Sequence, residues 1–373
     1  MGIGNLRNKA LRAIYAKMIT KHYNDFYGGI CDKSIQKMKK SGEDQWIEKW
    51  SILGYKANPI YYRLFSEYCG KDINIVPEDV CRIAIETAMN PERFRGFYSD
   101  KNSWDLFFGD DIFPSTVFRC MDGVLLDSKY KVLNEEEALG LLDDGKKYAI
   151  KPTIDTNSSK GFHSINCNSG NIMCAGRSIK SIGDLKEIEG ENFIVQPFMK
   201  QHKNLSQFCS TNVNPIRITT YRSVKDEAIH VLDGGVLRIG FEGEENDGTH
   251  GNGKFVGIER NGTLKHEVLD YKGNIAHQFN GVDFMNGEYA IPNFDEVKHV
   301  AIKVAEKVLH ARLCAFDIML DENCVPIVFE FNIISYSMWL AQFTGTPAFG
   351  EYTDEMIEYT KRNYRNSKKV LLY

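Results

Sequence analysis

Three polar side chains interrupt an otherwise apolar stretch of the chain, residues 315–332. The stretch contains two apolar runs joined by the polar segment 321–324, which predicts a β-hairpin whose strands are buried on both faces. The exceptions are Asp317, Glu330 and Asn332. Glu330 and Asn332 are two residues apart and therefore leave one face of their strand. The position of the turn predicts Asp317 on the same face of the partner strand.

Two carboxylates and an amide clustered inside an apolar hairpin are costly to bury without a cation. Ligands that offer only oxygen suit Mg²⁺, which keeps some waters and shares its coordination shell with substrate phosphates. A hairpin end whose carboxylates accept hydrogen bonds from loop amides is the alternative. We favour the metal site, because three inward polar groups on one face are hard to satisfy in another way.

The segments Phe316-Asp317-Ile-Met-Leu and Val328-Phe-Glu330-Phe-Asn332 resemble the metal-binding hairpin of the ATP-grasp superfamily, whose usual form is an Asp followed by Glu-x-Asn. The resemblance implies an α+β fold in which two α+β lobes clasp the nucleotide. It also implies that ATP cleavage is coupled to joining a carboxylate and a nucleophile through an acyl phosphate. The expected cofactors are ATP and Mg²⁺, with Asp317, Glu330 and Asn332 as the metal ligands.

A predicted strand ending in Lys151-Pro152 runs into a loop of small residues. Backbone amides of such a loop can cradle phosphates, and a lysine at the strand end can pair with their charge. The arrangement resembles the ATP-grasp Lys-Pro strand and its phosphate loop, with Lys151 as the phosphate lysine, although serines stand at 158 and 159 where glycines are commoner. The loop residues expected to bind phosphate are Ser158, Ser159, Lys160 and Gly161.

Lys101 comes just before a predicted short helix, residues 103–108, and could face phosphates gathered at the N-terminus of that helix. An Asp-Lys pair at the start of the nucleotide domain often does this in ATP-grasp proteins, and Lys101 occupies the corresponding place. A solvated turn explains the same dipeptide, so both interpretations stay open.

Residues 193–199 form a predicted strand that ends in the hinge Gln196-Pro197-Phe198-Met199. The resembling ATP-grasp hinge holds adenine through one backbone carbonyl and, two residues on, one amide. Pro197 lacks an N–H but keeps its carbonyl. Met199 would then supply the amide, and Phe198 or Met199 an apolar contact with the ring. An ordinary strand-to-loop transition explains this stretch equally well.

Arg217 and Arg238 each lie in a predicted strand, and arginine is well suited to hold phosphate oxygens or a carboxylate. The patterns Asn-x-Ile-Arg-x-x-Thr and Leu-Arg-Ile-Gly, followed by Asn252, resemble the sugar-transfer-associated ATP-grasp family, which is tied to bacterial surface polysaccharides such as capsule and O-antigen. Val256 and Gly251 depart from that family's usual residues, and no arginine follows Asn332, so the phosphate clamp would depend on Arg217 and Arg238 with Lys151. Taken singly, each arginine could instead form an ordinary ion pair.

Length and composition fit an enzyme of several subdomains. The chain has 373 residues, 43% hydrophobic residues and a formal net charge of −4, which gives no overall attraction to nucleic acid. Its nine cysteines form no C-x-x-C motif, so neither zinc nor a disulfide framework is indicated. With no signal peptide or spanning apolar run, we expect a cytoplasmic protein.

The first part of the chain is predicted to be helical. Residues 6–23 have apolar residues at helical spacing and no acidic residue, so the helix either packs on its own domain, which we favour, or contacts the inner face of an anionic membrane. Further helices are expected at residues 45–54, 60–69 and 77–89. The predicted organisation is a helical region (1–97), a small lobe with the phosphate loop (98–195) and a large lobe with the metal hairpin (196–373).

These features predict an ADP-forming carboxylate–amine ligase. The resemblance suggests that the carboxylate is a sugar acid such as a uronic acid, free or nucleotide-linked, and that the amine is an amino acid or another amine. The residues themselves do not identify these substrates. A sugar or glycan kinase with the same nucleotide site is the first alternative, and a non-catalytic nucleotide-binding partner of a glycosyltransferase complex is the second.

Overall fold

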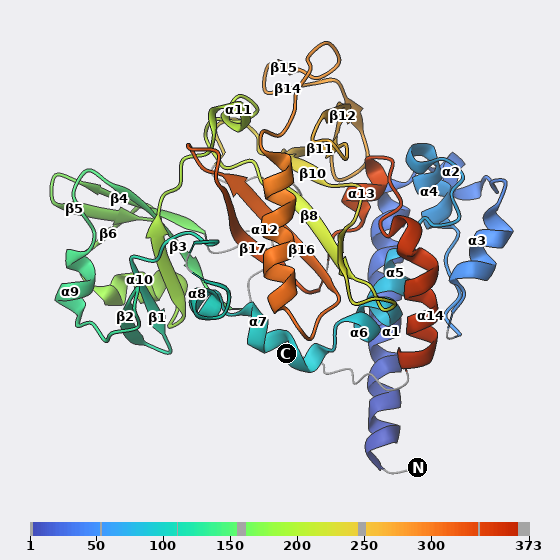
Figure 1. Cartoon of the computed structure of the whole chain (residues 1–373), viewed down its shortest axis with the longest axis horizontal. Coiled ribbons are helices and arrows are strands. Elements are labelled where there is room, and N and C mark those ends of the chain that lie inside the picture. The colour runs from blue at the N-terminus through green and yellow to red at the C-terminus, as the bar shows by residue number, and fades with distance from the viewer. Residues whose placement is uncertain are drawn as a thin grey trace. The chain divides into compact units, whose positions relative to one another are not determined.

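The computed structural model describes residues 3–52, 54–109, 111–154, 162–244, 251–334 and 336–364, with side chains from residue 6 onward. It divides into two compact units. The large unit comprises Met1–Arg95, Gln201–Pro326 and Glu330–Tyr373, and the small unit comprises Gly96–Lys200 and Ile327–Phe329. Each unit contains its own β-sheet with helices (Figure 1), so the predicted α+β class is confirmed. The N-terminal helices group with the strands of the large unit.

The large unit is built on an eight-stranded sheet. Helix α12 (Phe294–Lys307) packs on β8, β9 and β16 (Figure 1). The strand order is β13 (Ile275–Ala276), β12 (Leu264–Leu269), β11 (Lys254–Ile258), β10 (Val236–Ile239), β8 (Ile216–Arg222), β16 (Leu313–Leu320) and β17 (Pro326–Asn332), with β9 (Ile229–Val231) also paired with β8.

The predicted hairpin is formed by β16 and β17, which are neighbours in this sheet. Its turn closes where the Cys324 N–H donates to the Asp321 carbonyl at 2.9 Å and the Asp321 N–H donates to the Val325 carbonyl at 3.0 Å. Cys324 has a φ of 67°, a left-handed conformation that such a turn requires of one residue. Every residue of β16 is buried, whereas β17 is partly exposed at residues 329, 330 and 332, so burial on both faces holds for the first strand only.

The predicted N-terminal helices are present and share one core with the C-terminal helix. Trp46, Trp50, Tyr61 and Phe65 are fully buried in that core. The helix expected at residues 45–54 already ends at Trp50. The helices of this core are α1 (Ile3–Ile30), α2 (Lys33–Lys37), α3 (Glu43–Trp50), α4 (Ile60–Cys69), α5 (Glu78–Val80), the π-helical turn η1 (Cys81–Ile85), α6 (Glu86–Met89), α13 (Trp339–Phe343) and α14 (Thr353–Asn363).

Asn90, directly after α6, links the N-terminal helices to the hairpin strands. Its side-chain amide nitrogen donates to the carbonyls of Leu313 (2.7 Å) and Ile333 (2.6 Å) and contacts the Tyr336 hydroxyl (2.6 Å). Its carbonyl oxygen accepts from the backbone N–H groups of Arg312 and Leu313, at 2.9 and 3.0 Å. Because a buried amide with all these partners is costly to disturb, Asn90 fixes the start of β16 and the chain just after β17 relative to the helices.

The small unit is an antiparallel seven-stranded sheet with two helices that begin with capping boxes. Asn134 and Glu137 cap one of these helices, and Ser181 and Asp184 cap the other. The strand order is β2 (Val124–Asp127), β1 (Phe118–Met121), β7 (Phe193–Pro197), β3 (Lys147–Pro152), β4 (His163–Asn168), β5 (Asn171–Cys174) and β6 (Arg177–Ile179), with helices α9 (Glu135–Gly140) and α10 (Ile182–Glu189).

Short elements complete both units. They are the 3-10 turns η2 (Glu92–Phe94), η3 (Lys101–Ser103) and η4 (Gly350–Tyr352), the helices α7 (Arg95–Ser99), α8 (Trp104–Phe108) and α11 (Lys203–Ser206), and the two-residue strands β14 (Gln278–Phe279) and β15 (Val282–Asp283).

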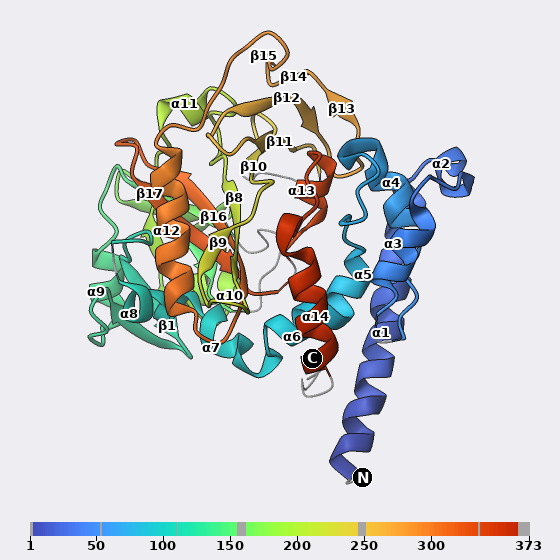
Figure 2. The same ribbon diagram turned by 45° about the vertical axis from the view of Figure 1, so that its right-hand side comes forward.

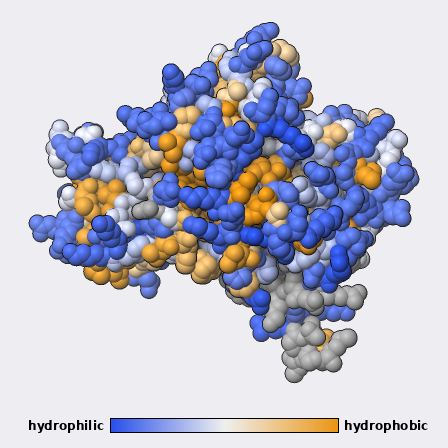
Figure 3. All heavy atoms as spheres, in the orientation of Figure 1, coloured by the Kyte–Doolittle hydropathy of each residue, from blue (hydrophilic) through white to orange (hydrophobic). Residues whose placement is uncertain are grey.

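The viewed surface is mainly hydrophilic, with hydrophobic side chains gathered in separate areas (Figure 3). Among the described helices, none combines the length and the apolar character needed to cross a membrane. All nine cysteines are free thiols, and seven of them are buried, as expected for small apolar side chains.

Candidate active site

Three of the predicted site residues lie on neighbouring strands of the large sheet. Arg217 on β8 is directly opposite Asp317 on β16. On the other side of β8, Arg217 is opposite Val236 of β10, and Arg238 follows two residues later on the same face of that strand. Residues that are distant in the sequence thus meet because β8 lies between β10 and β16.

The two arginines hold the Asp317 carboxylate between them. Arg217 binds it in a bidentate manner, with Nε 2.7 Å from Oδ1 and Nη2 2.9 Å from Oδ2. Arg238 Nη1 lies 3.4 Å from Oδ1. The Asp317 side chain is 1% exposed, and those of Arg217 and Arg238 are 10% and 14% exposed. Charge-assisted contacts in so dry an environment are strong, but each partner also carries a large desolvation cost.

One donor of this cluster is left over. Arg217 Nη1 is buried and finds no hydrogen-bond partner within the described part of the chain. Arg217 also borders a small cavity of about 20 Å³. The loop Asp233–Gly235, which lines this cavity, also lines a larger groove of about 760 Å³ whose other wall is α12. A buried cationic donor on a residue that borders a cavity is suited to an anionic oxygen.

Glu330 and Asn332, the other two predicted metal ligands, lie two residues apart on β17 and are partly exposed. Together with Asp317 they form an oxygen-only donor set, which fits a hard divalent cation. The described residues hold no cluster of three or more His, Cys, Asp or Glu side chains arranged for a metal, and this set has only two carboxylates beside its amide. Since both Asp317 oxygens accept hydrogen bonds from arginine, binding a metal there requires at least one of these bonds to be exchanged.

In the small unit, Lys151 and Lys101 lie near the end of β3. Lys151 Nζ is 3.4 Å from the Phe329 carbonyl oxygen. Lys101 is the first residue of η3, its backbone N–H donates to the Thr153 carbonyl at 3.1 Å, and its ammonium lies 5.7 Å from the centre of the Trp104 ring. The predicted helix start after Lys101 is therefore a 3-10 turn followed by α8.

The predicted adenine hinge is the end of β7. Gln196 pairs with Ala149 of β3, and its side-chain amide donates to the Pro114 carbonyl at 3.0 Å. Pro197 is the last residue of the strand. The Phe198 N–H donates to the Lys147 carbonyl at 3.1 Å, and the Lys147 ammonium lies 4.0 Å from the Phe198 ring centre. Phe198 and Met199 are both partly buried.

Of the remaining predicted site residues, one is exposed and the others lie outside the described residues. Asn252 is exposed, and its amide donates to a carboxylate oxygen of Glu244 at 2.8 Å. The predicted phosphate-loop residues, Ser158, Ser159, Lys160 and Gly161, lie outside the described residues.

A comparison with protein-family models decides the family. The model described as "Sugar-transfer associated ATP-grasp" matches residues 123–354, more than half of the chain. The chain belongs to this ATP-grasp family. The resemblance drawn from the hairpin and the two arginine strands is therefore confirmed. ATP-grasp enzymes use ATP with a divalent metal.

The chain is similar to several solved structures at low sequence identity and low TM-score. A D-alanine–D-alanine ligase from Bacillus anthracis is 13% identical with a TM-score of 0.36, and the match covers 73% of this chain and 69% of that one. D-cycloserine synthetase DcsG is 11% identical with a TM-score of 0.39, covering 74% and 73%. D-alanyl-alanine synthetase A from Vibrio cholerae O1 biovar eltor str. N16961 is 11% identical with a TM-score of 0.36, covering 80% and 68%. No curated protein matches.

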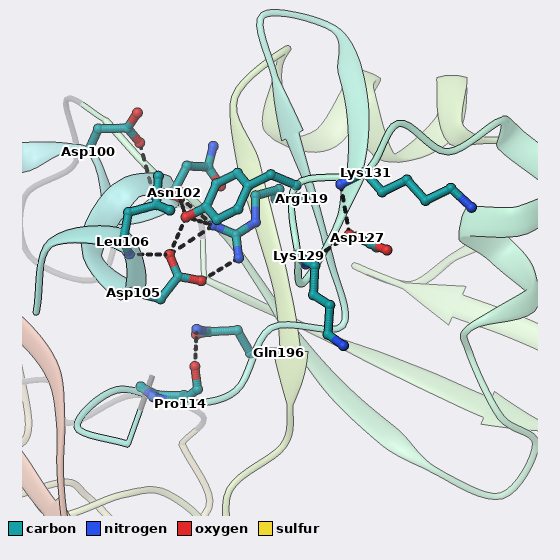
Figure 4. Close-up of polar contacts among 11 residues, drawn as sticks. Asp100, Asn102, Asp105, Leu106, Pro114, Arg119, Asp127, Lys129, Lys131 and Gln196 are labelled. Atoms are coloured by element: carbon teal, nitrogen blue, oxygen red, sulfur yellow. Dashed lines mark hydrogen bonds and ion pairs between the residues drawn. The ribbon is translucent and has the colours of Figure 1, made fainter. Parts of the chain in front are cut away.

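Sequence reasoning missed a buried arginine cluster in the small unit of this ATP-grasp protein. Arg119 on β1 is 0% exposed, and its guanidinium donates to the Asp105 carboxylate (2.5 Å to Oδ2), to the Asn102 carbonyl and to the Tyr130 hydroxyl (Figure 4). Burial, together with the hydrogen bond to Asp105, raises the pKa of Tyr130. Lys101 is the neighbour of Asn102, so this cluster supports the backbone at a predicted phosphate-binding residue. A single arginine in a four-residue strand gives no sequence signal for it.

Asn214 opens the arginine motif and was not assigned a role. It is 0% exposed, and its amide donates to the carbonyls of Leu205 (2.8 Å) and Cys209 (3.0 Å). Gln201 accepts from the Asn214 backbone N–H at 3.0 Å. Both side chains fasten the loop that leads into β8, and they thereby position Arg217.

Proposed function

We propose that the protein is an ATP- and Mg²⁺-dependent carboxylate–amine ligase that acts through an acyl phosphate. The observation that carries the proposal is the meeting of Arg217, Arg238 and Asp317 on three adjacent strands, with a buried guanidinium nitrogen left over beside a cavity. Two cations and one carboxylate leave a net positive charge there, which favours an anionic transition state.

In the proposed mechanism, Asp317, Glu330 and Asn332 hold the metal. A bound Mg²⁺ supplies positive charge that offsets the negative charge of the β- and γ-phosphates. If Asp317 held the metal, at least one of its hydrogen bonds to arginine would be exchanged, and the 3.4 Å contact with Arg238 is the longest of these. Arg238 and Arg217 Nη1 would then donate to the transferring phosphoryl group.

The small unit supplies the remaining contacts in this proposal. Lys101, Lys151 and the loop residues 158–161 hold the phosphates, the hinge 196–199 holds adenine, and Asn252 of the large unit contacts the nucleotide. The substrate carboxylate attacks the γ-phosphate, ADP leaves, and the amine then displaces phosphate from the acyl phosphate to form an amide. No covalent enzyme intermediate is needed, because cations and backbone amides suffice to stabilise the phosphoanhydride.

We further propose a sugar acid, such as a uronic acid, as the carboxylate and an amino acid or another amine as its partner, in surface-polysaccharide biosynthesis such as that of capsule or O-antigen. The support is membership of the sugar-transfer associated family. The proposed location is the cytoplasm, at the inner face of the membrane.

The direct test is a screen of sugar acids and amines for ADP release, with mass spectrometry of the products. We expect an amide product and, with the correct acid but no amine, a hydroxamate trapped by hydroxylamine in proportion to the ADP formed. ADP formation with a phosphorylated hydroxyl and no hydroxamate would overturn the ligase proposal in favour of the kinase.

Hydrogen exchange with and without ATP and Mg²⁺ tests the nucleotide site. We expect protection at residues 151–161, 193–199 and 315–332. A response confined to the N-terminal helices would contradict the proposed nucleotide site.

A further inference from the structure

Helix α1 has one face inside the large unit and one face in solvent. Tyr27 is 0% exposed and Ala16 is 7% exposed, and the helix contacts α4, α5 and η1. This bears out the expectation that the helix packs on its own domain. The contacts lie mainly toward its C-terminal half, and both ribbon views show its first turns extending beyond the rest of the large unit (Figures 1 and 2).

The solvent face of α1 mixes apolar and cationic side chains. Leu6, Ile14 and Met18 are 63%, 52% and 61% exposed. Lys17 and Lys21 are also exposed. The positions 14, 17, 18 and 21 follow the i, i+3, i+4, i+7 spacing and therefore share one side of the helix. The sequence contains no acidic residue before position 25, and Asp25, four residues after Lys21, is the first acidic residue of the helix, so the part of this face from Leu6 to Lys21 carries only positive charges.

We propose that this face of α1 lies on an anionic membrane surface. Exposed apolar side chains can enter the boundary between headgroups and acyl chains, while lysine ammonium groups remain among anionic headgroups. Each lysine near such a surface adds a favourable electrostatic term. Because the whole chain has a net charge of −4, the attraction must be local, and the short screening length in physiological salt, about 8 Å, makes it salt-sensitive.

Two other occupants fit the face less well. A nucleic acid would use the lysines but leave Leu6, Ile14 and Met18 in water. A second copy of this helix in a symmetric dimer would bring like charges together, which is unfavourable. The combination of apolar and basic side chains on one side is what favours a lipid surface. The inference does not depend on the reaction that the enzyme catalyses.

The test is co-sedimentation of the full-length protein with vesicles of phosphatidylcholine alone or of phosphatidylcholine with phosphatidylglycerol. We expect binding only to the anionic vesicles, and weaker binding as the salt concentration rises. The double variant Lys17→Glu/Lys21→Glu should lower the partition coefficient at least about tenfold. Its matched control is Lys129→Glu/Lys131→Glu, which changes the net charge equally at two exposed lysines of the small unit (Figure 4) and should bind like the wild type.

A second, uncharged variant separates lipid from other polyanions. Ile14→Gln/Met18→Gln keeps every charge and replaces only exposed side chains, so circular dichroism should be unchanged while vesicle binding falls several-fold. Three outcomes would overturn the proposal: no binding of the wild type to anionic vesicles, equal losses in the two charge variants, or binding to a DNA duplex that the Gln variant leaves intact. Light scattering that shows a dimer broken by the Gln variant would assign the face to a second copy instead.

Discussion

Two of the arginine–carboxylate pairs among the described residues differ in how fully they are enclosed. In the small unit, Arg119 is 0% exposed, donates to Asp105, a backbone carbonyl and a tyrosine hydroxyl, and has the Tyr130 ring 4.0 Å from its guanidinium carbon. In the large unit, Arg217 has one carboxylate partner, a second arginine nearby and a cavity beside it.

The difference shows that a buried ion pair is not in itself evidence of a ligand-binding site. Arg119 donates from Nη1 and Nη2 to groups of its own unit, its Nε is buried without a partner among the described residues, and such a pair adds specificity at a high desolvation cost. At Asp317, by contrast, two guanidinium groups face one carboxylate. That excess of positive charge can stabilise a bound anion. The predictions below test this contrast, from the largest expected effect to the smallest.

Glu330→Gln should abolish turnover, because a neutral amide cannot supply the charge that the proposed metal site needs. The side chain keeps its shape, so the thermal unfolding midpoint without ligand should stay within a few degrees of the wild type. The midpoint should also lose any increase caused by Mn²⁺ or Mg²⁺ with ATP. Wild-type turnover at saturating Mg²⁺ would remove Glu330 from the metal site.

Arg217→Lys should raise the barrier of the chemical step by about 3–4 kcal/mol, a rate loss of several hundred-fold. Lysine keeps a positive charge beside Asp317 but lacks the planar fork and the Nη1 donor. Single-turnover kinetics with saturating ATP measure this step directly. If the variant loses stability but keeps its rate, Arg217 is a structural partner of Asp317, as Arg119 is of Asp105.

Arg119→Met should affect stability and not the rate. It should lower the free energy of unfolding by about 3 kcal/mol with little change in turnover per folded molecule. Removing the guanidinium leaves Asp105 without its cation, but the Asp105 side chain is 21% exposed, so the loss stays at the lower end of the usual range. Urea unfolding and an active-site titration supply the two measurements. A large fall in turnover at unchanged stability would show that the two pairs are not as different as we argue.

Glu78 is a buried carboxylate to compare with Asp105 and Asp317. It accepts a hydrogen bond from the phenol of Tyr27, whereas the other two are paired with arginine. Burial raises its pKa from 4.5 to about 7, even though Tyr27 and Arg82 act in the opposite direction. The folded state therefore binds a proton more tightly than the unfolded state, and stability should fall as the pH rises from about 4.5 to 7. The total loss from this group is up to about 3 kcal/mol.

Glu78→Gln should remove that part of the pH dependence. Urea unfolding of both proteins between pH 5 and pH 8 is the measurement, and the two curves should diverge as the pH rises, with the variant the more stable at the upper end. Parallel curves would mean that Glu78 does not carry the proton. Asp79, whose pKa burial raises to about 6, is the neighbouring group that would then be tested.

The sequence was sufficient for the elements but not for their neighbours in space. Two nearly continuous apolar runs joined by a polar turn predicted the hairpin of β16 and β17. The ion pair between Arg217 and Asp317 was not predicted, although both residues were assigned to the site. It depends on β8 lying next to β16, a pairing across 100 residues that no local pattern contains.

The same limit explains the residues that were missed. Arg119, Gln201 and Asn214 donate to backbone carbonyls that are 17, 11 and 9 residues away in the sequence, and carbonyls are present at every position of a sequence. The π-helical turn at Cys81–Ile85 was expected to be ordinary α-helix. Its apolar and polar spacing over 77–89 fits either form, because one widened turn changes the period only locally.

That widened turn has a consequence for how the chain can change in evolution. A π-turn accommodates one more residue than the α-helical turn it replaces, so deleting one residue within Cys81–Ile85 would restore regular helix at little local cost. A deletion in the regular helix Glu86–Met89 would instead rotate everything after it by about 100° and shift it by about 1.5 Å. Asn90 would then miss the carbonyls of Leu313 and Ile333, at the two ends of the hairpin of β16 and β17. Deletions should therefore be tolerated better within residues 81–85 than within residues 86–89 among functional relatives.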